Sequence, residues 1–155
     1  MIDVVALGEL LIDFATISVD GDGYPTMAAH PGGAPDNFLA ALSKFGAKTA
    51  FIGKVGNDTF GKLLAATMEK KGICTKGLVL ADDVFTTLAF VTLDETGNRE
   101  FAFARKPGAD MFLTCADVDQ AFSMNPQIVH AGSCSLSKAP ASDATVYAME
   151  KAAQA

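Results

Sequence analysis

The chain has 155 residues, of which 50% are hydrophobic, 19% charged and 8% aromatic, and its formal net charge is −6. This composition predicts one globular domain with a substantial core and excludes collagen-like, coiled-coil and disordered chains. The acidic balance argues against a nucleic-acid partner, and no apolar run reaches the roughly 18 residues of a membrane helix. The three cysteines show no CxxC spacing, which predicts buried, reduced thiols and a cytoplasmic protein.

Extended segments are predicted at the start of the chain and again near its first third. Residues 4–9 form a short, apolar, β-branched run that predicts a buried strand, and Leu10–Ile17 predicts a second extended segment. Residues 18–33 contain several Gly and Pro residues and are predicted as a loop. Lys48–Lys54 is predicted as the next strand.

Two helices are predicted between and after these strands. The first begins at Pro35 and stops at Gly46, and the second begins at Asp58, a capping residue, and ends at Gly72. The resulting order of strand, helix, strand, helix predicts an α/β fold, a doubly wound sheet with helices on both faces. The apolar spacing predicts these buried helix faces: Phe38, Ala41, Leu42 and Phe45 in the first helix, and Phe60, Leu63, Leu64, Thr67 and Met68 in the second.

The alternation then breaks at a predicted hairpin. Residues 86–93 and 99–105 are extended runs joined by the Gly-containing segment 94–98. A hairpin does not fit readily into a parallel sheet, so we expect a projecting flap. Because side chains alternate along a strand, Phe101, Phe103 and Arg105 share one face of it.

The last third predicts a return to helices and a strand. A short helix begins near Thr114, with Asp117 completing a capping box, and an apolar strand follows over Gln127–Ala131. The final helix, Ser142–Ala155, stops with the sequence and has no glycine cap. A helix in such a series returns the chain to another strand, so we expect a domain that is truncated.

Asp13 and the segment from Gly32 to Asn37 are candidate binding residues. A carboxylate inside an apolar run is costly unless it is hydrogen-bonded, and an ionised carboxylate accepts bonds from hydroxyl groups such as those of a sugar. Holding loop amides is an equally good interpretation of Asp13. Gly32 and Gly33 let a ligand approach the backbone, and Asn37 offers a donor and an acceptor; an ordinary glycine-rich turn is the alternative.

Three other features could carry catalytic or ligand-binding chemistry. Gly56–Leu63 matches the P-loop pattern except at Leu63, where a Ser or Thr hydroxyl is required, so we reject it. Arg105 could hold a ligand with paired donors or simply cover apolar surface. His130 ends an apolar strand and fits a packed core residue better than a base, and no metal-ligand spacing is found.

Four segments resemble the phosphofructokinase-B family of ribokinase-like sugar kinases. Gly32–Gly61, with the sequence GGAPDNFLAALSKFGAKTAFIGKVGNDTFG, is similar to the family's first signature, although Leu39 stands where a small residue is usual. LGELLIDF at 7–14, REFAFARKPGADMFL at 99–113 and HAGSCSLS at 130–137 resemble the fructokinase branch. The resemblance covers essentially the whole chain.

The resemblance implies a ribokinase-like doubly wound sheet with a small β-sheet lid that closes over a sugar. Residues 1–155 would be the N-terminal portion of one such domain, with lid strands at about 11–18 and 86–105. The substrate-binding positions that it implies are Asp13, Gly32, Gly33, Asn37, Phe103 and Arg105.

The reaction implied is transfer of the ATP γ-phosphoryl group to a hydroxyl of a small sugar, most similar to fructose phosphorylation, with Mg²⁺ bridging phosphates. The family's general base and anion hole lie in a Gly-Ala-Gly-Asp segment, which this sequence lacks. We therefore expect no catalytic residue here, ATP and Mg²⁺ held mainly by the other half, and no kinase activity in this chain alone.

Several alternatives stay open at this point. The acceptor could be ribose, a nucleoside or 2-keto-3-deoxygluconate instead of fructose, and the resemblance leaves open a homodimer formed through the lid. A non-catalytic sugar-binding module or a fragment without any ligand would be compatible with the same residues.

Overall fold

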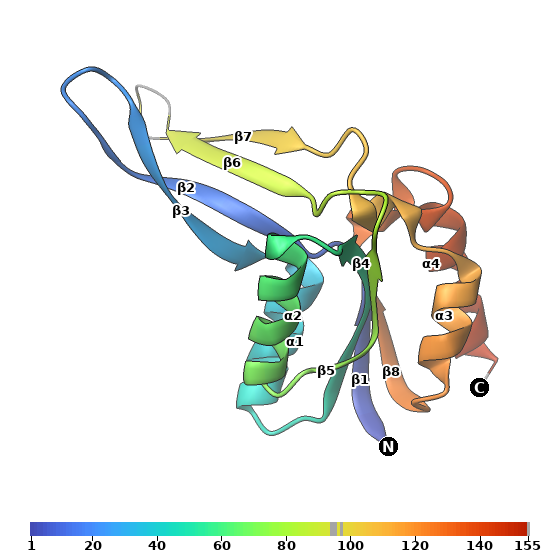
Figure 1. Ribbon diagram of the computed structural model, residues 1–155. Helices are drawn as coiled ribbons and strands as arrows, with labels where there is room; N and C mark the ends of the chain where they lie inside the picture. The colour runs from blue at the N-terminus through green and yellow to red at the C-terminus, as the bar shows by residue number, and fades with distance from the viewer. Residues whose placement is uncertain (94–95, 97, 155) are drawn as a thin grey trace.

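The computed structural model describes residues 1–93, 96 and 98–154. Its main sheet has four parallel strands in the order β5-β4-β1-β8, as Figure 1 shows. These strands are β1 (Ile2–Leu7), β4 (Thr49–Gly56), β5 (Cys74–Ala81) and β8 (Pro126–Ala131).

Helices cover both faces of this sheet. Val4 and Ala6 of β1 point to one side of the sheet. They pack in the core between the sheet and the helices α1 (Ala34–Lys44) and α2 (Thr59–Lys70). Val5 and Leu7 point to the other side, toward α3 (Cys115–Phe122) and α4 (Ala141–Ala153). Because side chains alternate along a strand, the unbroken apolar run Val4–Leu7 of β1 must be buried on both faces. The prediction of a doubly wound α/β sheet is confirmed.

A second sheet projects from the carboxyl end of the main one. Its order is β3-β2-β6-β7, and β6 runs parallel to β2 while both outer pairs are antiparallel. Only Gly8–Leu10 separates β1 from β2, so the chain passes directly from one sheet into the other (Figure 1). We call it the lid sheet; its strands are β2 (Leu11–Val19), β3 (Pro25–Gly32), β6 (Leu88–Leu93) and β7 (Arg99–Ala104).

The lid sheet confirms the hairpin of β6 and β7 outside the main sheet and corrects one prediction. Residues 25–32, predicted as loop, form β3, which pairs antiparallel with β2. Pro25 and Pro31 suggested a loop because proline lacks the N–H that a strand donates. β3 lies at the edge of the lid sheet, where a missing N–H can face solvent at no cost. The predicted hairpin turn falls partly outside the described residues, since 94, 95 and 97 are not among them.

Helix positions were predicted well, but the buried sides of the first two helices were partly wrong. α2 begins after Asp58, as expected, and buries Gly61, Leu64 and Met68, whereas Leu63 is 43% exposed. α1 is rotated so that Leu39 is fully buried and Phe45, at its end, is 88% exposed. The rejected P-loop match stays rejected, because its second glycine lies inside α2.

The second half of the chain follows the predicted order with one omission. Strand β5 was not predicted, because its alternation is weak and Gly77 interrupts it. Thr114 and Asp117 form the predicted capping box at α3, with Asp117 Oδ2 accepting from the Thr114 N–H at 2.8 Å. Two 3₁₀ helices, η1 (Ala109–Phe112) and η2 (Ser133–Leu136), follow β7 and β8.

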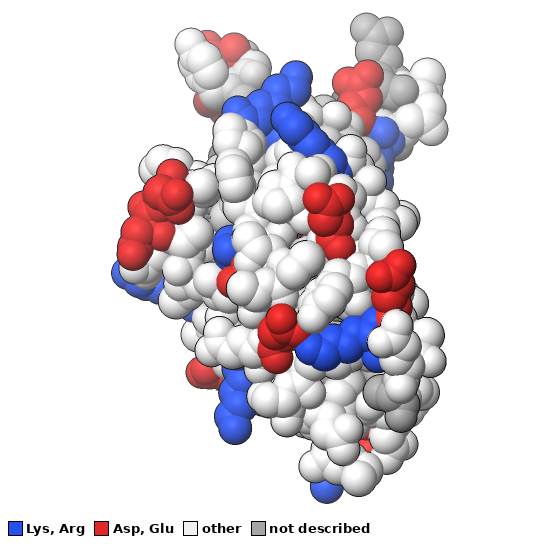
Figure 2. Space-filling model, turned by 90° about the vertical axis from the view of Figure 1, so that its right-hand side faces the viewer, with Lys and Arg blue, Asp and Glu red and all other residues white. Residues whose placement is uncertain are grey.

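The cysteines are free thiols, but the prediction that they are buried was wrong. Cys115 and Cys134 are exposed and Cys74 is half-buried. Among the described helices, none is both long and apolar enough to cross a membrane. On the molecular face that carries α3 and α4, acidic and basic side chains are scattered in small groups between uncharged residues (Figure 2).

Candidate functional site

The functional candidates gather where β1 ends and the lid sheet begins. A cavity of about 270 Å³ lies there, and Glu9, Leu11, Phe103, Arg105, Lys106 and Cys134 line it. Ligands of open α/β sheets bind beyond the carboxyl ends of the strands, and this cavity occupies that place next to β1 and β8.

Asp13 lies on the same face of the lid sheet as Leu11 and Phe103, two residues beyond Leu11 along β2. Asp13 is in register with Ala89 of β6, and Ala89 is in register with Phe103 of β7. The small Ala89 side chain separates the carboxylate from the aromatic ring. Paired residues share a face, so the lid presents an acceptor and a ring on one face with the small Ala89 between them. Asp13 also lines a second cavity of about 460 Å³ with Thr16, His30 and Phe101 among others.

The Asp13 carboxylate is available for a ligand. Among the described residues, none donates a hydrogen bond to it. Burial raises the pKa of Asp13, and the electrostatic interaction with His30 offsets only part of that rise. A partly desolvated carboxylate that no side chain or N–H of the described residues engages is an acceptor that a sugar hydroxyl could occupy.

Gly32 and Gly33 are required by close packing against β2 and the loop before it. A side chain on Gly32 would collide with the Asp13 carboxylate. Gly33 has a φ of 121°, where only glycine is relaxed, and a Cβ there would lie 2.5 Å from the Glu9 carbonyl oxygen. The paired glycines thus hold the start of α1 against Glu9 and Asp13.

Glu9 was not singled out from the sequence. Its side chain is only 6% exposed, and its Oε1 accepts from the Ala34 N–H at the start of α1 at 3.1 Å. Its Oε2 is buried without a hydrogen-bond partner among the described residues. The available signal was a carboxylate directly after a buried strand and a glycine, which is where α/β proteins place binding residues.

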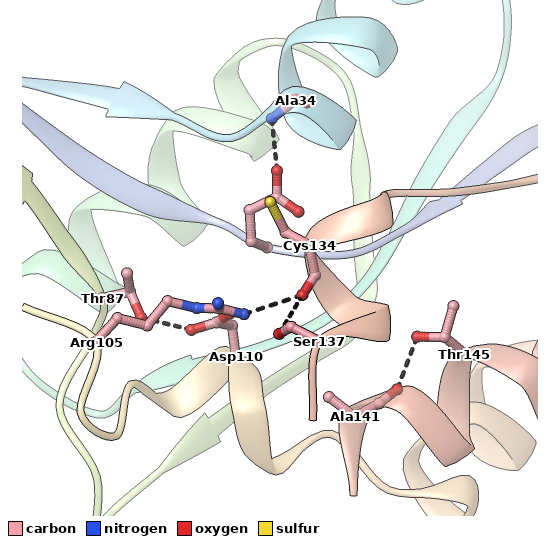
Figure 3. A network of polar contacts seen from close by, with 9 residues as sticks. Ala34, Thr87, Arg105, Asp110, Cys134, Ser137, Ala141 and Thr145 are labelled. Carbon is pink, nitrogen blue, oxygen red and sulfur yellow. Dashed lines mark hydrogen bonds and ion pairs between the residues drawn. The ribbon is translucent and has the colours of Figure 1, made fainter. Parts of the chain in front are cut away.

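Arg105 lies at the rim of the cavity and is held from two sides. Its Nε donates to Asp110 Oδ2 at 2.8 Å, its Nη2 lies 2.7 Å from the same oxygen, and Nη2 also donates to the Cys134 carbonyl at 3.3 Å. Figure 3 shows the guanidinium between Asp110 and Cys134. Burial alone would lower the pKa of Arg105, but Asp110 outweighs it and raises the pKa, so the group stays cationic.

Cys134 brings a thiol to the same cavity, although the sequence did not mark it for binding. Burial raises the pKa of this thiol, the negative charge of Glu9 raises it further, and Arg105 opposes both effects. Neutral Cys134 therefore contributes a small, weakly polar wall opposite the lid.

Asn37 lies elsewhere in the structure. It is exposed on the first turn of α1 and lines a groove of about 900 Å³ with residues of α1 and α2, including Lys44, Phe45 and Lys70. The structure thus brings Asp13, Gly32, Gly33, Phe103 and Arg105 to one region and places Asn37 beside a different cavity.

The fold and this site define an α/β domain with a β-sheet lid beside a cavity that combines apolar walls with a few charged side chains. The family model of pfkB carbohydrate kinases matches residues 1–155, and the chain belongs to this family. Fructokinase-2 of Oryza sativa subsp. japonica is 43% identical over 156 residues, which cover 98% of this chain and 46% of the relative.

Solved structures agree with this assignment. The crystal structure of fructokinase from Xylella fastidiosa has a TM-score of 0.90 and 32% identity, covering 97% of this chain and 47% of that one. The same enzyme with bound ATP has a TM-score of 0.89 and 32% identity, covering 99% and 49%. The chain spans about half the length of these relatives and corresponds to their N-terminal half.

Proposed function

We propose that this chain is the sugar-binding half of an ATP-dependent fructokinase. The observation that carries the proposal is the Asp13 carboxylate, which accepts no hydrogen bond from the described residues, shares one lid face with Phe103 and lies next to the cavity of Glu9 and Arg105. The family and the relatives named fructokinase support fructose as the acceptor.

The proposed role of this half is to bind and orient the sugar. Asp13 accepts a hydrogen bond from one hydroxyl, the backbone at Gly32 and Gly33 approaches the ring, and Phe103 covers its apolar face. Holding a reacting hydroxyl in place contributes much of the rate of phosphoryl transfer, since that chemistry depends mainly on positioning and charge stabilisation. Asn37 stays a prediction from the resemblance, which the groove around it does not support.

ATP is the proposed phosphoryl donor, with Mg²⁺ to neutralise its phosphates when bound. Among the described residues, no group of three or more His, Cys, Asp and Glu side chains lies close enough to hold a metal ion. Mg²⁺ and most of the ATP are proposed to be held by the other half, as the resemblance implies. The general base is likewise proposed to lie outside this chain, because the sequence contains no Gly-Ala-Gly-Asp segment.

Two further expectations are kept as proposals. A homodimer through the lid is supported by β7, an edge strand on which Phe101 and Phe103 stack and are each 53% exposed. A cytoplasmic location is supported by three cysteines that are free.

Calorimetric titration of the folded chain with fructose tests the proposal. We expect saturable binding of fructose, with ribose and 2-keto-3-deoxygluconate each binding at least about tenfold more weakly, a difference of about 1.4 kcal/mol. Stronger binding of ribose or 2-keto-3-deoxygluconate would replace fructose by that alternative. Absence of heat with all three sugars, in a sample with native circular dichroism, would contradict a sugar site.

A further inference from the structure

We propose that Asp110 is a positioning residue that fixes Arg105 at the cavity and fastens both stems of the lid hairpin. The inference rests on the proposed sugar site. Asp110 lies in η1 and is only 3% exposed, so its charge is stabilised by its partners and hardly by water.

Both oxygens of Asp110 are engaged. Oδ1 accepts from the Thr87 hydroxyl at 2.5 Å, and Oδ2 receives Nε and Nη2 of Arg105 at 2.8 and 2.7 Å (Figure 3). The two guanidinium nitrogens share one oxygen, which fixes the plane of the group as well as its position.

The two partners of Asp110 come from the two ends of the hairpin. Thr87 directly precedes β6, and Arg105 directly follows β7. The Thr87 carbonyl also accepts from the Ile12 N–H at 3.1 Å, which connects the network to β2. The Asp110 carboxylate is therefore connected to the starts of β2 and β6 and to the end of β7.

Close packing leaves this network little freedom. A side chain on Gly108 would collide with the Thr87 hydroxyl, and Asp110 Oδ1 lies 2.9 Å from the same hypothetical Cβ. Arg105 also reaches the Cys134 carbonyl of η2, so its guanidinium spans from the lid to the end of β8. Among the contacts of the described residues, its Nη1 has no hydrogen-bond acceptor, and this is the group left to meet a ligand.

Asp110→Asn tests the inference, with Asp117→Asn as its matched control. Asp117 forms an ion pair of 2.8 Å with Lys54 and does not line the cavity. We expect Asp110→Asn to weaken fructose binding about tenfold, as the loss of a charged hydrogen bond allows, and Asp117→Asn to change it less than about twofold. The Nε–H resonance of Arg105, assigned with Arg105→Lys, should move upfield only in Asp110→Asn.

A double-mutant cycle separates positioning from general destabilisation. In an Arg105→Ala background, Asp110→Asn should cause no further loss of fructose affinity, because the group it positions is gone. If Asp110→Asn does not fold, Thr87→Val removes one of its bonds at similar volume and should weaken binding by about threefold.

Losses of fructose affinity that add up in the double variant would overturn the inference. An unchanged Arg105 resonance in Asp110→Asn would overturn it as well. A wild-type chain that binds no sugar would contradict the proposed function instead. In that case the Arg105 resonance still decides whether Asp110 holds the guanidinium.

Discussion

Among the candidate residues, Asp13 is a charged group whose surroundings disfavour its charge. Asp13 is partly buried, has no hydrogen-bond donor among the described residues, and lies so close to Gly32 that no larger residue fits there. A carboxylate in such surroundings fits the binding role proposed for it, since proteins commonly give up stability at the site where they act.

The first prediction concerns Asp13. Burial raises the pKa of Asp13 in the folded state above its unfolded-state pKa of about 3.8. The contribution of Asp13 to the free energy of unfolding is therefore fully present below about pH 3.8 and is lost as the pH rises through the folded-state pKa. At neutral pH Asp13→Asn should therefore leave the free energy of unfolding equal or higher, while fructose affinity falls at least about tenfold.

Urea denaturation and calorimetry of the same samples measure the two effects. Asp22→Asn, in the turn between β2 and β3, removes a charge from the lid without touching the cavities of Asp13. Equal affinity in Asp13→Asn and the wild type would remove Asp13 from the site.

The second prediction concerns Asp58 and has the opposite sign. Its Oδ1 caps α2 by accepting from the N–H groups of Phe60 and Gly61 at 2.9 and 2.8 Å, and its Oδ2 accepts from the Thr86 N–H at 2.8 Å. Burial pushes the pKa of Asp58 up, but these bonds outweigh it and hold the pKa below its usual value.

Asp58→Ala should thus destabilise the chain by about 2 kcal/mol at neutral pH, the upper range for a lost cap. The stabilisation from Asp58 is present above about pH 3.8 and is lost as the pH falls through its folded-state value. The variant should therefore lose less stability than the wild type from about pH 5 to about pH 3. Parallel denaturant midpoints at both pH values check this, and identical losses would contradict it.

At the scale of elements, the lid sheet is attached by aromatic packing on its inner face. Phe14 of β2 meets Phe60 of α2 edge-on at 5.5 Å and stacks on Phe90 of β6 at 5.4 Å. This face points to α2, while the opposite face carries Asp13 and Phe103. The third prediction is that Phe14→Ala loosens the lid and leaves the main sheet intact.

Because the Phe14 ring is only half-buried, its removal should reduce the free energy of unfolding by about 2 kcal/mol, which is below the range for fully buried phenylalanines. Amide hydrogen exchange should accelerate in β2 and β6 but not in β1 and β4, because lid opening is a local event. Phe38→Ala, on α1 beside His130, serves as the control. Uniform acceleration over both sheets would refute a separately attached lid.

Elements with strong local periodicity were predictable from the sequence, whereas the edge strands β3 and β5, which contain proline or glycine, were not. The buried strand at Val4, the capped helix at Asp58 and the hairpin all carry local signals that tertiary packing did not override. β3 and β5 are edge strands, where glycine and proline are tolerated, so the same residues that suggest a loop occur in a strand.

A candidate ligand residue could be predicted only where it breaks its local pattern. Asp13 interrupts an apolar strand, so the sequence marks it, and its role in binding stays a prediction. Glu9 and Asp110 lie in ordinary loop sequence, and their importance comes from burial and from partners distant in the chain, such as Ala34 and Thr87. The rotation of α1, which turns Asn37 toward another groove, depends on packing at Leu39 that spacing alone does not determine.

The whole molecule joins a lid sheet to a main sheet, and we propose that the two bind sugar without supplying the transfer machinery. The fourth prediction is that the isolated chain binds fructose and forms no ADP from ATP above the buffer rate. A coupled ADP assay measures the second property on samples whose fructose binding has been verified. Fructose-dependent ADP formation that persists after repeated purification would show that this half contains its own catalytic base.

The last strand of the main sheet has a practical consequence. β8 pairs with β1 on one side only among the described strands, and its Ile128 is 58% exposed. An uncovered strand edge offers a row of hydrogen-bonding groups to any other extended backbone, including that of a neighbouring copy. Concentrated preparations should therefore be prone to precipitation, and a lysine in place of Ile128 is the simplest remedy for handling the protein at the concentrations that calorimetry requires.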